Sequence, residues 1–93
     1  MSDKAGKKVT LDIGGKEFDF TVDLPKYNAF VDGAAKGQVS AAAYNFVSMT
    51  VSNEQRGDML ELLDQGLAVE IAQPLAEEFK PTVKITVKKS NAA

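Results

Sequence analysis

Few side chains in this 93-residue sequence have the type and spacing that chemistry on a small molecule requires. The sequence contains no histidine and no cysteine, so the usual general base, the commonest metal ligand and a thiolate nucleophile are all missing. A Ser–Lys arrangement could be drawn between Ser40 and Lys36, but nothing in their spacing selects it. The sequence therefore predicts a protein that is not an enzyme and has no small-molecule substrate.

Two groups near the start of the chain could bind ions. Carboxylates can hold a hard cation, and four of them lie close together in sequence: Asp12, Glu17, Asp19 and Asp23. Their spacing does not match an EF-hand loop, so a solvated strand face is the preferred interpretation. Gly14-Gly15 could cradle a phosphate, but a phosphate loop leads into a helix, and a second strand follows here. We predict neither a metal nor a cofactor.

The elements that would position any site begin with a β-hairpin over residues 9–22. Gly14-Gly15 fits a two-residue turn in which both positions need a positive φ. On either side of it, apolar residues alternate with polar ones, the period of a strand with one buried face. The apolar residues of the two strands are Val9, Leu11, Ile13, Phe18, Phe20 and Val22.

Two helices are predicted directly after the hairpin. Asp23 is a good N-cap for the first, which should end between Gly33 and Gly37 because glycine weakens a helix interior. Ser40 is expected to cap the second helix, over residues 41–51. The first helix carries an apolar stripe formed by Leu24, Tyr27, Phe30, Val31 and Ala34.

Two more helices are predicted in the second half of the chain. Ser52 and Gln55 have the spacing of a capping box, so a third helix should start there. An amphipathic pattern over residues 67–79 predicts a fourth helix. Pro74 lies inside it, and because proline removes one helical hydrogen bond we expect a bend or two shorter helices.

A last alternating segment at residues 82–88 predicts a strand that could pair with either strand of the hairpin. The hairpin and this strand each have one apolar face and cannot be stable alone. We therefore predict an α+β fold in which the N-terminal hairpin plus the C-terminal strand form a small three-stranded sheet packed on about four helices. Residues 8–88 should form a single domain, between a flexible arm at 1–7 and a flexible tail at 89–93.

Composition excludes several classes of function. The net charge of −2 argues against a nucleic-acid binder, since such domains normally carry a basic excess. No apolar run approaches the roughly 20 residues that span a bilayer. The first residues carry charge without an apolar stretch behind them, so we expect no secretory signal. Protein partners therefore remain the main expectation.

The predicted helix at residues 41–51 is the best candidate for a partner surface because it is apolar on nearly all sides. The core of a small protein cannot easily cover every side of such a helix, and exposed apolar area on a small protein often marks an interaction site. The alternative is a fully buried central helix. The candidate partner-binding residues are Tyr44, Phe46, Val47 and Met49.

These pieces, in this order and at this length, resemble the small tail assembly chaperones of tailed bacteriophages. The resemblance covers about residues 8–88 and depends on the overall layout. Its parts are the hairpin at 9–22, Tyr27-Asn-Ala-Phe30, Ala43-Tyr-Asn-Phe-Val47, Leu60-Glu-Leu-Leu63, the helix at 71–79 and Val83-Lys-Ile-Thr-Val87.

The resemblance implies a non-enzymatic, phage-encoded protein of the host cytoplasm. Such chaperones are thought to coat the tape measure protein and keep it soluble until the tail tube polymerises around it. Many also occur in a longer, frameshifted form, and Lys88-Lys89 could be encoded by a slippery run of adenines. The alternative is another small phage adaptor, structural or scaffold protein, with possible self-association.

Overall fold

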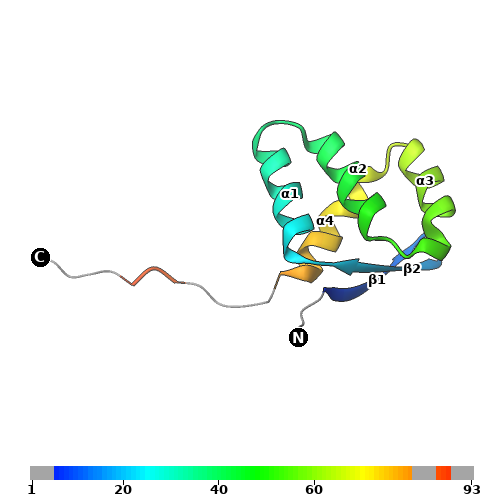
Figure 1. Cartoon of the computed structure of the whole chain (residues 1–93), viewed down its shortest axis with the longest axis horizontal. Coiled ribbons are helices and arrows are strands. Elements are labelled where there is room, and N and C mark those ends of the chain that lie inside the picture. Colours follow the sequence, from blue (N-terminus) through cyan, green and yellow to red (C-terminus); the bar gives the residue numbers. More distant parts are fainter. Residues whose placement is uncertain (1–5, 81–85, 89–93) are drawn as a thin grey trace, which may run out of the picture.

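The computed structural model describes residues 6–80 and 86–88. In this part of the chain, four helices lie on one face of a two-stranded hairpin (Figure 1). A short 3₁₀ turn, η1 (Asn53–Gln55), precedes the third helix. The other elements are β1 (Lys7–Ile13), β2 (Lys16–Val22), α1 (Leu24–Ala35), α2 (Val39–Thr50), α3 (Arg56–Asp64) and α4 (Ala68–Phe79). The predicted α+β class with a hairpin and four helices is confirmed.

The hairpin has the predicted turn. Its strands are antiparallel, with Val9 opposite Phe20 in a register that leaves Gly14 and Gly15 between them. Both glycines have positive φ, 64° and 91°, as a two-residue hairpin turn requires. The Oδ1 atom of Asp12 accepts a hydrogen bond from the backbone N–H of Gly15 at 2.9 Å, which further stabilises the turn.

The outer edge of β2 is covered by the segment that enters α3. The backbone N–H of Ser52 donates to the carbonyl of Asp19 at 2.8 Å. The Gln55 side chain accepts from the N–H of Asp19 and donates to the carbonyl of Glu17, both at 2.8 Å. Ser52 is the N-cap of η1, which leads directly into α3 at Arg56, so a helical element begins where it was predicted. The hydrogen bonds of a capping box are not formed, because the Gln55 amide bonds the strand instead.

The predicted third strand, at residues 82–88, lies mostly outside the described part of the chain. Of its residues, 86–88 are described, and these have no regular secondary structure. Within the described residues the sheet has the two strands β1 and β2. Because the outer edge of β2 is covered, β1 offers the edge at which a further strand could pair.

The first two helices are joined by a tight turn. Glycine at position 37, with φ of 84°, follows the last residues of α1. The N–H of Gly37 donates to the carbonyl of Ala34 and that of Gln38 to the carbonyl of Gly33, which together form a Schellman motif. This turn starts α2 at Val39, so Ser40 lies within the helix and the predicted Ser40 cap is wrong.

Pro74 lies inside α4 without dividing it. The helix is continuous from Ala68 to Phe79, so the expectation of two shorter helices is wrong. A proline at position 74 leaves the carbonyl of Glu70 without its helical donor. Both residues are exposed, so water can satisfy that carbonyl.

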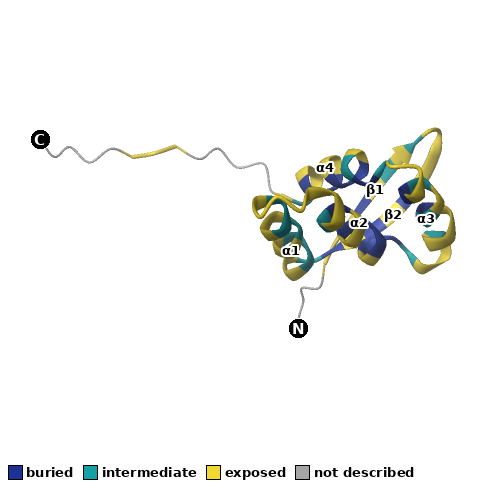
Figure 2. Cartoon of the chain, turned by 90° about the horizontal axis from the view of Figure 1, so that it is seen from above, coloured by how far each residue is buried: buried dark blue, intermediate teal, exposed yellow. Residues whose placement is uncertain are grey.

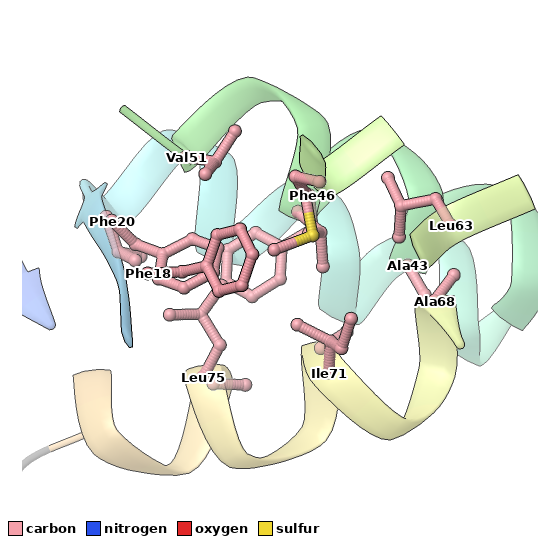
Figure 3. Close-up of a cluster of buried hydrophobic side chains, with 14 of the residues drawn as sticks. Phe18, Phe20, Ala43, Phe46, Val51, Leu63, Ala68, Ile71 and Leu75 are labelled. Carbon is pink, nitrogen blue, oxygen red and sulfur yellow. The ribbon is translucent and has the colours of Figure 1, made fainter. Parts of the chain in front are cut away.

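The hydrophobic core lies between the hairpin and the helices α2, α3 and α4. Figure 3 shows Phe18 and Phe20 of β2 pointing into the space between α2 and α4, where Leu75 and Ile71 meet them. The largest fully buried side chains are Phe18, Phe20, Val22, Val47, Met59 and Leu75. The first helix contributes no buried residue, and Figure 2 shows it in the colours of intermediate and exposed positions.

Candidate partner-binding site

Helices α1 and α2 form an antiparallel pair that is tightest near its connecting turn. A Cβ atom at Gly33 would lie 2.6 Å from the Cβ of Ala42, closer than two such atoms can approach. Glycine therefore allows the two backbones to come together at this end. Further along, the helices are held apart by the rings of Phe30 and Phe46, which stack with centroids 5.0 Å apart and an interplanar angle of 9°.

The space beside this stacked pair is an apolar groove. It has a volume of about 350 Å³ and lies between the N-terminal half of α1 and the C-terminal half of α2. We call it the α1–α2 groove. Its lining is formed by Pro25, Lys26, Ala29 and Phe30 of α1 and by Ala42, Asn45, Phe46 and Met49 of α2.

One charged side chain, Lys26, lines the groove, and it is held at the start of α1. Its ammonium lies 2.9 Å from Oδ2 of Asp23, while its backbone N–H donates to Oδ1 of the same carboxylate at 3.0 Å. These hydrogen bonds from Lys26 lower the pKa of Asp23 below its ordinary value. Asp23 is thus the N-cap of α1, as predicted, and holds the Lys26 ammonium beside a largely apolar surface.

The four predicted partner-binding residues lie in different environments. Met49 is 56% exposed and forms part of the groove lining, and Phe46 lines it too although it is only 2% exposed. Val47 is fully buried in the core. Tyr44 is 37% exposed but lies about 140° around α2 from Met49, because the two are five residues apart on a helix. The structure therefore brings Phe46 and Met49 together and separates Tyr44 from them.

Sequence reasoning missed the contribution of α1. The apolar stripe predicted on this helix suggested a packed face, yet Leu24 is 57% exposed and Val31 is exposed as well. Tyr27 is half-buried and contacts Phe79 of α4, with ring centroids 5.1 Å apart. The sequence signal that could have shown this exposure was the width of the apolar stripe on α1, because a single neighbouring helix covers only part of so broad a face.

Three of the four acidic residues in and beside the hairpin make structural contacts with their side chains. Asp12 bonds the turn and Asp23 caps α1, while Oδ1 of Asp19 accepts from the hydroxyl of Thr10 at 2.8 Å. On the other side of the hairpin tip, Lys16 pairs with Asp58 of α3. Among residues 6–80 and 86–88, no group of three or more potential ligands is placed to hold a metal ion.

The described helices are also too short or too polar for a bilayer: none of those within residues 6–80 could cross one.

The sequence that builds this hairpin and these four helices matches a known class of protein. The chain belongs to the phage tail assembly chaperone family, whose sequence profile matches residues 9–89. The resemblance seen in the sequence is thereby confirmed.

One curated relative comes from Haemophilus phage HP1 (strain HP1c1) and is described as an uncharacterized 11.3 kDa protein in the lys 3' region. It is 28% identical to this chain over 81 residues, which cover 86% of this chain and 79% of the relative. No solved structure gives a significant match.

Proposed function

We propose that this chain binds the tape measure protein during phage tail assembly and keeps it soluble until the tail tube forms around it. Membership of the tail assembly chaperone family supports a role in building tails. The observation that carries the proposal is the α1–α2 groove, an open apolar surface beside the core. A long partner helix needs its apolar stripe covered reversibly before assembly, and helix-in-groove binding provides such cover.

The lining of the groove suits an amphipathic helix of the tape measure protein. Phe30 and Phe46 form an aromatic floor, and Met49 lies at the exposed rim. Methionine adapts its shape to different apolar partners, which suits a surface that meets many turns of one long helix. The ion pair of Lys26 and Asp23 adds a polar edge to this apolar lining.

Of the predicted residues, Met49 and Phe46 belong to this proposed site, and Val47 supports it from the core. Tyr44 lies on another face of α2, and its part in binding stays a prediction. The proposed role is non-enzymatic and takes place in the host cytoplasm. A different adaptor or scaffold function is the alternative, and finding the chain in purified mature particles would favour it, because a chaperone leaves before maturation.

The test is co-expression with the tape measure protein of the same phage, followed by affinity purification through a tag on the tape measure protein. Met49→Asp introduces a charge at the rim of the groove, while Tyr44→Asp introduces the same charge on the other side of α2. Both side chains are exposed, so far-UV circular dichroism should show both variants folded. We expect Met49→Asp to abolish co-purification and Tyr44→Asp to retain it.

The reverse outcome, with binding lost only in Tyr44→Asp, would assign the partner to the opposite face of α2. Retention by both folded variants would exclude α2 as the binding surface. Absence of co-purification with the unsubstituted chain would overturn the proposed function itself.

A further inference from the structure

The outer edge of β1 lacks hydrogen-bonding partners among the described residues. In an antiparallel pair, residues alternate between bonding the neighbouring strand and pointing their N–H and C=O groups away from it. Glu17 and Asp19 of β2 point away, toward Gln55 and Ser52, so the residues opposite them in β1 also point away. Thr10 and Asp12 therefore present their backbone groups at the outer edge of β1, the kind of edge that accepts an added strand.

A second apolar groove runs along this edge, between β1 and the first half of α4. It has a volume of about 270 Å³ and is distinct in its lining from the α1–α2 groove. Its apolar lining comes from Leu11, Ile13, Leu67, Ile71 and Pro74. The two charged residues of the lining, Asp12 and Glu70, are both acidic. The β1–α4 groove thus suits an extended segment that has apolar side chains on one face and basic ones nearby.

The chain itself contains such a segment at residues 82–88. Its sequence alternates Val83, Ile85 and Val87 with polar residues, and two of these are Lys84 and Lys88. It has seven residues, the same number as β1. Its lysines complement the two acidic residues of the groove lining, Asp12 and Glu70, and its apolar residues have the period of a strand with one buried face.

Val87, which is among the described residues, does not lie in the groove of its own chain. The side chain is 88% exposed, although docking in the β1–α4 groove would bury it. Within the described residues β1 thus has an open edge, and the sequence of the same chain contains an alternating apolar segment that matches it. We propose that two copies exchange these segments, with residues 82–88 of each copy adding a strand to β1 of the other. A reciprocal exchange closes into a symmetric dimer.

Sedimentation of the full chain over a range of concentrations tests this proposal. The unsubstituted chain should form a dimer. Val87→Asp places a charge where the groove is apolar and should raise the dimer dissociation constant by about tenfold or more, as expected for one buried apolar side chain. Thr86→Asp is the matched control, because it adds the same charge one residue away on the opposite face of the strand; we expect a change of less than about twofold.

A substitution on the other side of the contact tests the groove. Thr10→Pro removes an outward N–H from an edge position, where proline is tolerated, and should weaken the dimer without loss of the circular dichroism signal. If this variant does not fold, Glu70→Lys reverses a charge at an exposed site and should weaken the dimer most at low salt.

A monomeric wild-type chain at all concentrations would overturn the exchange. If Val87→Asp nevertheless lowered the stability of that monomer, the segment would be assigned to its own groove. Equal effects of Val87→Asp and Thr86→Asp, or a dimer unaffected by the substitutions at β1 and α4, would also overturn the proposal. None of these readouts depends on the tape measure protein, so failure here leaves the proposed function standing.

Discussion

Neighbouring residues of α2 have different roles that the sequence alone could not separate. Phe46 and Val47 are buried, whereas Met49 is mostly exposed, although all are apolar and within one turn of each other. A helix that is apolar nearly all round has no periodic signal to show which face its neighbours cover. The residue types thus predicted a helix at this place, but the division between core and groove depended on where α1 and α4 pack.

Asp23 provides a residue-scale prediction because its side chain caps α1. Asp23→Ala should lower the free energy of unfolding by about 1 kcal/mol at neutral pH. Lys26 lowers the pKa of Asp23 from its ordinary value of 3.8, so the cap stabilises the fold fully above that value. The contribution is lost as the pH falls through the lowered folded-state pKa.

Urea denaturation of Asp23→Ala and the unsubstituted chain, at neutral pH and again in acid, measures this difference. Asp32→Ala, an exposed substitution on the same helix, is the control and should change stability by less than about 0.5 kcal/mol. A difference that is equally large in strong acid would contradict the role of the ionised carboxylate.

Gly33 makes a prediction about the contact between α1 and α2. Gly33→Ala should destabilise the protein by about 1–2 kcal/mol, because steric overlap with Ala42 outweighs the gain in helix propensity. Adding Ala42→Gly should recover part of the loss. Gly57→Ala is the control, since a Cβ there would meet nothing within 4 Å, and it should stabilise α3. Additive effects of Gly33→Ala and Ala42→Gly in a double-mutant cycle would rule out the contact.

Among the elements, the hairpin was the easiest to predict and the entry into α3 the hardest. Strand alternation and Gly14-Gly15 specify the hairpin locally, so its register follows from nearby residues. The spacing of Ser52 and Gln55 is typical of a capping box. In the structure, however, the side-chain amide of Gln55 bonds the backbone of β2, which is distant in sequence. A signal within four residues could not reveal a contact across nearly 40 positions of the chain.

The hydrogen bonds of Gln55 predict its contribution to stability. Gln55→Ala removes two hydrogen bonds to the backbone of β2 and should lower the free energy of unfolding by about 1–2 kcal/mol. Gln65→Ala, at the exposed end of α3, is the matched control. Hydrogen exchange should show the N–H of Asp19 losing protection in Gln55→Ala and keeping it in the control. Unchanged protection of that amide would exclude the contact.

For the whole molecule, the sequence predicted the class of fold and the order of the hairpin and four helices, because the strands and most of the helices show their apolar faces as a period in the sequence. It could not predict how completely the faces are covered. Leu24 and Val31 carry the expected stripe of α1, yet the helix lies at the margin of the core with no buried residue. This incomplete cover creates the α1–α2 groove, so the candidate site is a property of the packing rather than of any local motif.

The central claim is that the α1–α2 groove keeps the tape measure protein soluble. Two exposed alanines of α1 allow a matched comparison: Ala29 lines the groove, and Ala35 lies outside its lining, about 120° around the helix. The most direct measurement is the soluble fraction of the tape measure protein when it is co-expressed with the chain carrying Ala29→Lys or Ala35→Lys. We predict that Ala29→Lys leaves the tape measure protein insoluble and that Ala35→Lys protects it as the unsubstituted chain does. Equal protection by both folded variants would contradict the claim.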